Sequence, residues 1–313
     1  MSLTKPYLNL KKPIKIALYA IIACVLLELI LRFGVGLGDI PVYVEDEDYE
    51  YIMAPNQSVK RFGNRIETNA YSMRSAMPAK EDRFRILKFG DSIINGGNHT
   101  TQDSLASEHL KRDLNAIDEP AVNVLNVSAG SWGPDNAFAY LTKHGHFDAD
   151  VMVLVFSSHD LHDNMHFRKV VGEHPAWPDS KPLLAMTDLF GRYVIPRIKS
   201  WFGQRAEYEY LVGFDDSKIN SGLYDFPEYC KENDIPLLFY LHPTREELKN
   251  DSYNENGQQL IKIMEENDVT VIQGFNTNLT DDCYRDQIHL NDKGQRVLAE
   301  TLYNHLEKMV NTH

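Results

Sequence analysis

From residue 83 onward, short apolar runs alternate with longer stretches in which apolar residues recur every three or four positions. The short runs predict buried strands, and the longer stretches predict amphipathic helices. Strands that alternate with helices favour right-handed βαβ units, and so an α/β fold with helices on both faces of a parallel sheet. The predicted strands are Phe84–Phe89, Val122–Val127, Val151–Phe156, Pro236–Leu241 and Val269–Ile272. The predicted helices are Ser104–Leu114, Asp135–Lys143, Phe226–Glu232, Gly257–Glu266 and Asp292–Met309.

A different pattern occupies the N-terminus. The run Ile14–Leu31 is almost entirely apolar, and its length is about the minimum for a helix that crosses a bilayer. Lysines precede the run and acidic residues follow it, so the positive-inside tendency places the N-terminus in the cytoplasm. Glu28 and Arg32 stand four residues apart and can pair on one helix face. We therefore predict a cytoplasmic tail over 1–13, a single transmembrane anchor over 14–33, and the remaining chain in the periplasm or outside the cell.

Two other interpretations of this apolar run stay open. A cleaved signal peptide has a similar apolar core, but no small-residue cleavage site follows the run here. Ile21-Ile22-Ala23-Cys24 resembles a lipoprotein cleavage box, which would make Cys24 a lipidated N-terminus, but the chain continues apolar beyond it. All three interpretations place the folded domain outside the cytoplasm.

The rest of the chain divides into a lead-in and one large domain. Residues 34–82 contain several turn residues and little helical periodicity, and residues 83–313 form the domain. Within it, the stretch at about 162–224 separates two predicted strands and contains Trp177, Trp201 and several tyrosines. Insertions of this length usually form a lid or a binding region, and we expect that role here.

The net charge argues against one class of partner, and the cysteine content argues against a disulfide-bonded fold. The net charge of −13 argues against a nucleic-acid partner, because phosphate binding needs clustered Lys and Arg. Three cysteines are too few for a disulfide scaffold. Because Cys24 lies in the apolar run, Cys230 and Cys283 are the one pair that could bridge in an oxidising compartment, if their Cα atoms come close enough. We expect two free, buried thiols instead.

Two short motifs carry the candidate chemistry. Gly90-Asp91-Ser92 follows the first predicted strand, and a serine at the carboxyl end of a parallel strand lies where open α/β sheets bind ligands. Near the C-terminus, Asp286 stands three residues before His289. On one turn, the carboxylate can hold one imidazole nitrogen while the other nitrogen takes a proton from a hydroxyl. That is the arrangement of a Ser-His-Asp triad.

Together these motifs resemble those of the SGNH, or GDSL, hydrolases. The resemblance makes Ser92 the nucleophile, His289 the base and Asp286 the residue that orients the base. It covers the chain roughly from Ile66 to Leu306. The fold that it implies is a three-layer α/β/α sandwich with a flavodoxin-like, five-stranded parallel sheet.

Two further blocks of this family would supply an oxyanion hole beside the backbone N–H of Ser92. The glycine of one block corresponds to Gly130, and a slip of one residue would place Ser131 there instead. The other block normally reads Gly-x-Asn-Asp, whereas this chain has Ser-Ser-His-Asp ending at Asp160, with His159 in place of the Asn. An imidazole N–H donates a hydrogen bond as an amide does, so we expect His159 in the oxyanion hole.

One segment of the lead-in and one segment after the fourth predicted strand extend the resemblance. Asn69–Ser75 and Pro243-Thr244 resemble segments of membrane-anchored SGNH proteins that are associated with cell-surface polysaccharides. We expect four residues to give the site structural support: Asp91, Asp160, Asn69 and Arg74.

A group of histidines offers a competing interpretation as a metal site. On a helix, His162 and His166 would share a face and, with His159, could bind zinc. However, no Cys- or Glu-based pattern completes the ligand set. In the alternative interpretation, Asp160 and Asp163 hold the loop and the histidines line a cleft rim. We predict no metal, and the resemblance implies no organic cofactor.

The resemblance implies a serine esterase or deacylase acting on O-acyl groups, most simply O-acetyl esters, of a cell-envelope or extracellular polysaccharide. Its partners would be an acylated carbohydrate or another ester as substrate, and the membrane through the N-terminal helix. With a sugar hydroxyl in place of water, the same site would be an O-acyltransferase. A non-catalytic carbohydrate-binding or scaffolding protein of polysaccharide export is the alternative from another class, and the altered Ser-Ser-His-Asp block favours it.

Overall fold

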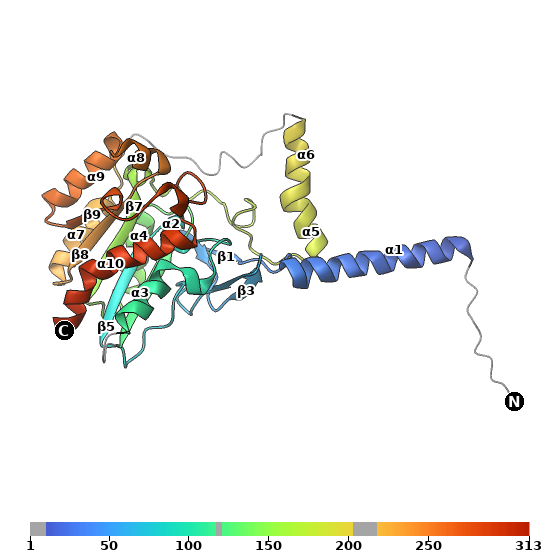
Figure 1. Ribbon diagram of the computed structural model, residues 1–313, viewed down its shortest axis with the longest axis horizontal. Coiled ribbons are helices and arrows are strands. Elements are labelled where there is room, and N and C mark those ends of the chain that lie inside the picture. The colour runs from blue at the N-terminus through green and yellow to red at the C-terminus, as the bar shows by residue number, and fades with distance from the viewer. Residues whose placement is uncertain (1–10, 117–120, 203–217, 313) are drawn as a thin grey trace.

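Five parallel strands form the central sheet in the computed structural model of this chain, which describes residues 11–116, 121–202 and 218–312 (Figure 1). Their order across the sheet is β6-β5-β7-β8-β9, which is the flavodoxin-like order 2-1-3-4-5. The predicted fold class is therefore confirmed. The strands are β5 (Phe84–Gly90), β6 (Val122–Ser128), β7 (Val151–Ser157), β8 (Leu237–His242) and β9 (Thr270–Gln273).

Helices cover both faces of this sheet because its strands are apolar on both sides. Every residue of β6 and β7 is buried, as expected for parallel strands between two helical layers. One layer packs against Phe89, Leu125 and Phe239, and it is formed by α4 (Pro134–His144), α7 (Gly222–Glu232) and α9 (Glu255–Glu266). The other layer packs against the opposite side of the strands, and it is formed by α2 (Ser92–Asn95), α3 (Ala106–Leu114) and α10 (Asp292–Thr312).

Short helices complete the loops of this domain. Helix α8 (Arg245–Asn250) follows β8, and its first turn is closed by a capping box between Thr244 and Glu247. The remaining short turns are the 3₁₀ segments η2 (Gln102–Ser104), η3 (Ser158–Leu161), η6 (Gly274–Asn276) and η7 (Asp281–Cys283).

The lead-in, for which the sequence predicted no regular structure, forms two antiparallel hairpins. Strands β1 (Tyr43–Asp46) and β2 (Glu50–Met53) make the first, and β3 (Ser58–Arg61) and β4 (Asn64–Glu67) make the second. Each strand is only four residues long. Such short strands depend on tertiary packing, and β2 is fully buried against the domain.

The N-terminal segment is a long apolar helix that extends away from the domain (Figure 1). It consists of α1 (Lys12–Leu29) and the π-helical turn η1 (Ile30–Val35). Over these 24 residues it is long and apolar enough to cross a membrane, and almost none of it is buried against the chain. The predicted pair near its end is present, with the Arg32 guanidinium 2.9 Å from the Glu28 carboxylate.

The described part of the insertion packs on the N-terminal helix and the lead-in. It contains α5 (Ala185–Leu189), the π-helical turn η4 (Phe190–Val194) and α6 (Ile195–Trp201). The backbone N–H of Ala185 donates to the Glu28 carboxylate at 2.7 Å. The expected lid also includes residues 203–217, which lie outside the described residues.

The two cysteines of the domain are separate free thiols. Cys230 packs in the core on the α4, α7 and α9 side, whereas Cys283 packs in the core on the α3 and α10 side. Because the sheet lies between them, the alternative of a disulfide is ruled out for this conformation.

Candidate active site

The candidate nucleophile lies at the first position of α2, directly after β5. An added Cβ at Gly90 would come within 2.5 Å of the Val155 carbonyl, so only glycine allows the chain to leave the sheet this closely. Asp91 is the N-cap, and its carboxylate accepts from the Ile93 N–H at 2.8 Å. This turn leaves Ser92 only partly buried, at the carboxyl edge of the sheet.

The structure brings Ser92, His289 and Asp286 into one hydrogen-bonded chain. The Ser92 Oγ lies 2.9 Å from His289 Nε2, and His289 Nδ1 lies 2.8 Å from the Asp286 carboxylate. Because Nδ1 faces a carboxylate, it carries the proton, and Nε2 is left as the acceptor for the serine hydroxyl. The side chains of His289 and Asp286 remain 30% and 48% exposed, so the group opens to solvent. This geometry fits general-base activation of a serine.

The loop that carries Asp286 and His289 is held by backbone contacts. The Asp286 carboxylate accepts from the N–H groups of Ile288 and His289, at 3.1 and 2.8 Å. Partial burial favours the neutral acid, but these bonds and the His289 ring prevail and lower the pKa of Asp286 to about 2. From β8, His242 Nε2 donates to the Ile288 carbonyl at 2.8 Å. Burial lowers the pKa of His242 to about 4, so this ring is neutral and fixed as a donor.

The loop after β6 places Gly130 next to open space. A Cβ added at Gly130 would meet no atom within 4 Å. Tyr51, on β2 of the lead-in, donates its hydroxyl to the Gly130 carbonyl at 2.8 Å, and Trp132 Nε1 donates to the Tyr51 carbonyl at 2.8 Å. The next residue, Ser131, has a φ of 59°, in the left-handed region. The lead-in hairpin thus fixes the orientation of the peptide group between Gly130 and Ser131.

His159 lies beside two buried carboxyl groups. Its Nε2 is 3.8 Å from Asp91 and 3.6 Å from Asp160, and its Nδ1 is 2.5 Å from Ser157 Oγ. Asp160 also accepts from the Ser157 N–H at 2.6 Å, which ties the loop after β7 to itself. Ligand atoms of Asp91, His159 and Asp160 lie within 4.8 Å of one another, a spacing that a metal ion could bridge.

The carboxyl groups around His159 hold protons at unusually high pH. Burial and the charge of Asp160 raise the pKa of Asp91 to about 7. Burial raises the pKa of Asp160 to about 7 as well, despite hydrogen bonds from Ser157 that lower it. Burial and the charge of Asp160 raise the pKa of Asp163 to about 8. Near neutral pH, some of these carboxyl groups therefore keep their protons, which reduces the repulsion between like charges.

The structure does not form the competing zinc arrangement of His159, His162 and His166. Residues 162–170 form no helix, so the two later histidines do not share a helical face. His162 Nδ1 lies 3.0 Å from the Lys218 carbonyl, whereas His166 Nδ1 accepts from the Arg168 N–H at 3.1 Å. Each histidine is thus turned to a different local partner.

Arg74 and Asn69 support the loop that follows Ser92. The Arg74 guanidinium is fully buried and donates to the carbonyls of Asn95, Gly97 and Thr100. Burial without a carboxylate partner within hydrogen-bond reach lowers the pKa of Arg74 to about 10. Asn69 accepts from the N–H of Met73, the residue before Arg74, at 3.1 Å. The lead-in therefore holds the loop that follows Ser92 in place.

Comparison with known proteins gives similar folds but no match by sequence. Neither a model of a known protein family nor a curated protein matches this chain. Among solved structures, a lipase/acylhydrolase from Enterococcus faecalis has a TM-score of 0.44 at 13% identity, covering 72% of this chain and 96% of its own. An acetyl xylan esterase has a TM-score of 0.42 at 14% identity, covering 71% and 100%. A member of the lipolytic G-D-S-L family from Veillonella parvula has a TM-score of 0.39 at 14% identity, covering 71% and 97%.

The chain thus has an α/β fold with a five-stranded parallel sheet. At these identities the similarity describes the arrangement of the chain alone, and any assignment of activity depends on the side chains of the site itself.

Three buried residues were not recognised from the sequence, and only Lys88 left a signal there. Tyr51 lies in the lead-in, where no strand was predicted, and His242 ends a strand as an ordinary polar residue. Lys88 lies within β5, and its buried Nζ has no hydrogen-bond partner among the described residues. Burial lowers the pKa of Lys88 to about 7. A lysine in the middle of an apolar strand is the one sequence feature that could have drawn attention.

Proposed function

We propose that this protein is a membrane-anchored serine esterase that removes O-acyl groups, most simply O-acetyl groups, from a cell-envelope or extracellular polysaccharide. The observation that carries the proposal is the unbroken chain of hydrogen bonds from Ser92 through His289 to Asp286. The polysaccharide as substrate is supported by the sequence resemblance of the lead-in. The open rim of the site, where Asp286 is 48% exposed, would admit a substituent on a bulky polymer.

In the proposed reaction, Ser92 Oγ attacks the ester carbonyl carbon while His289 Nε2 takes its proton. The oxyanion is held by the N–H groups of Ser92 and Gly130, with His159 as the third donor; loss of one such donor costs roughly 10²–10³ in rate. The tetrahedral intermediate collapses, and the leaving sugar oxygen receives the proton from His289. Water then attacks the acyl-serine by the same route and releases the carboxylic acid.

The proposed anchor is supported by the way α1 ends. Glu28 and Arg32, at the end of the apolar segment, both contact the insertion: the Glu28 carboxylate accepts from the Ala185 and Met186 N–H groups, and Arg32 donates to the Leu183 carbonyl. Cleavage after the apolar run would remove these contacts. We therefore propose an uncleaved helix with a cytoplasmic N-terminus and the Ser92 site in the periplasm or outside the cell.

The test is ester turnover by the full chain in detergent. We expect hydrolysis of a chromogenic short-chain ester and release of acetate from an O-acetylated polysaccharide. Ser92→Ala and His289→Ala should each abolish turnover to a similar extent, because triad residues act as a unit. Asp286→Asn should lose less, and His305→Ala, a histidine change on the far part of α10, should have no effect. Polysaccharide binding without any turnover would contradict the proposal and favour a binding protein.

A further inference from the structure

The insertion exposes large apolar side chains next to the N-terminal helix. We call the continuous segment Ala185–Trp201, made of α5, η4 and α6, the cross helix. Trp201 and the following Phe202 are 77% and 80% exposed. Phe190, Ile195 and Ile198 are also exposed on this segment. Soluble proteins rarely leave so many large apolar groups together in water, so such a patch marks an interaction surface.

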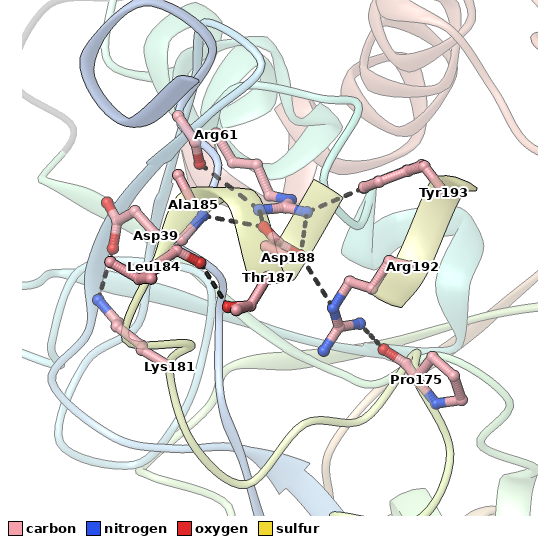
Figure 2. Close-up of polar contacts among 12 residues, drawn as sticks. Asp39, Arg61, Pro175, Lys181, Leu184, Ala185, Thr187, Asp188, Arg192 and Tyr193 are labelled. Atoms are coloured by element: carbon pink, nitrogen blue, oxygen red, sulfur yellow. Dashed lines mark hydrogen bonds and ion pairs between the residues drawn. The ribbon is translucent and has the colours of Figure 1, made fainter. Parts of the chain in front are cut away.

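The cross helix is fixed to the junction between α1 and the lead-in. Figure 2 shows Asp188 of α5 at the centre of this contact, facing Arg61 of β3. The two side chains are fully buried, with Arg61 Nη1 2.7 Å from the Asp188 carboxylate. Asp188 also accepts from the Gly38 N–H at 2.9 Å, and Arg192 lies 3.1 Å from it. Buried polar contacts therefore set the position of the cross helix relative to the lead-in, and the Glu28 carboxylate of α1 accepts from its first two N–H groups.

The direction of the cross helix is unlike that of α1. Figure 1 shows it crosswise to α1, at the end of α1 nearest the domain. If α1 crosses a bilayer, the cross helix lies along the bilayer surface on the side of the domain. Ile195, Ile198 and Trp201 recur every three residues on α6 and share a face, whereas Arg197 and Lys199 fall between them. Apolar and aromatic groups on one face with basic groups beside them are typical of helices in the lipid interface.

We propose that the cross helix lies in the lipid interface of the same membrane that α1 spans, with Trp201 and Phe202 inserted at the level of the headgroups. This inference rests on the proposed anchor. A single spanning helix leaves the domain free to rotate about the helix axis. A second, in-plane contact removes that freedom and holds the Ser92 site at one height and orientation above the bilayer.

The test uses the tryptophan fluorescence of the full chain in lipid nanodiscs. Of the three tryptophans, Trp132 and Trp177 are buried in the domain, and only Trp201 is exposed. Lipids brominated on their acyl chains should quench part of the emission, and Trp201→Phe should remove that part. Ile195→Asp with Ile198→Asp should lower the quenching while ester hydrolysis stays unchanged. Aqueous iodide should quench Trp201 in detergent-free nanodiscs only weakly.

A second measurement separates this inference from the anchor. Cys24 is the one exposed cysteine and lies within α1, so a membrane-impermeant maleimide should not label it when α1 spans the bilayer. One outcome would overturn the inference and leave the anchor intact. In it, Cys24 is protected from the maleimide, iodide quenches Trp201, and brominated lipid does not. Trp201 shielded from both quenchers would overturn it in favour of a contact with a second protein copy. Labelled Cys24 would show that the anchor itself is wrong and would overturn both.

Discussion

Two groups of buried charges in this chain are built in opposite ways. At the junction with α1, Arg61 and Asp188 pair at 2.7 Å with both side chains fully buried. Next to Ser92, Asp91 and Asp160 are also buried. Their neighbours include another acid, and their pKa values rise to about 7. The paired group fixes an arrangement of elements, whereas the like-charged group stores an electrostatic cost. Carboxyl groups with strongly raised pKa values concentrate at functional sites. Of the two groups, we therefore associate Asp91 and Asp160 with catalysis.

Breaking the paired group should have the largest effect on stability. Arg61→Ala leaves Asp188 buried with only part of its hydrogen bonding, and loss of one partner of a buried pair costs about 3 kcal/mol or more in the free energy of unfolding. Denaturant unfolding of the full chain in detergent measures this cost. The control is Arg61→Met combined with Asp188→Leu, which should recover most of the loss. A single-variant cost as small as that of a surface substitution would show that the pair is not structural.

The acidic group should change the pH dependence of stability. A carboxyl whose pKa is raised to about 7 in the folded chain keeps a proton that the unfolded chain has lost, so its stabilising effect is present below about pH 4 and disappears as the pH rises through about 7. Asp160→Asn removes this pH-dependent contribution to the free energy of unfolding. Relative to the original chain, the variant should therefore gain on the order of 2 kcal/mol in stability between about pH 5 and pH 8.

The comparison of Asp160→Asn with the original chain cancels groups that do not interact with Asp160. Asp91 and Asp163 do interact with it, because its charge raises their pKa values, and their response adds to the expected gain in the same direction. His242, whose pKa is shifted in the opposite sense, is present in both and cancels in the difference. A stability difference between Asp160→Asn and the original chain that does not change with pH would contradict the raised pKa of Asp160.

Arg74 tests whether the lead-in positions the nucleophile. Arg74→Lys keeps the charge, but one ammonium nitrogen cannot take the places of the two guanidinium nitrogens that donate to these carbonyls. Stability should therefore fall by roughly 1–3 kcal/mol. The turnover number should fall with little change in KM, because the change loosens the Ser92 turn rather than the substrate contacts. Arg65→Lys, on the exposed face of β4, is the matched control and should change neither quantity. An equal effect of both substitutions would refute a positioning role for Arg74.

The smallest effect is expected at His159. His159→Asn restores the residue type of the resembling family, so esterase activity should stay within about tenfold, or roughly 1.4 kcal/mol in the barrier. Metal analysis of the original chain and the variant accompanies this measurement, because Asp91, His159 and Asp160 have a spacing that a metal could bridge. Loss of a bound metal together with loss of activity in the variant would replace the oxyanion role with a metal role.

The fold was predictable where burial alone decides the structure. The runs at β6 and β7 are buried on both faces, and their predicted limits differ from the observed ones only at the last residue. The predicted ends of helices were less accurate where a residue that usually breaks a helix lies inside one. Helix α7 begins at Gly222 rather than Phe226, and Pro227 lies in its second turn, where a proline normally breaks a helix.

The candidate site was predictable for the residues whose chemistry shows in short motifs, namely Ser92, Asp286 and His289. The residues that hold these motifs in place were not. Tyr51 reaches Gly130 across 79 positions of sequence, and the hairpin that carries it has strands of four residues stabilised by the domain. Contacts of this kind depend on tertiary packing, which no local pattern of one sequence records.

Ser92 is the proposed activated nucleophile, and covalent labelling tests this role most directly. A fluorophosphonate reacts with a serine whose proton is taken by a neighbouring base, so peptide mapping by mass spectrometry should place the label on Ser92. Labelling should disappear in His289→Ala, in which the base at 2.9 Å from the hydroxyl is missing. A label on any other serine, or equal labelling of Ser92 with and without His289, would contradict the account.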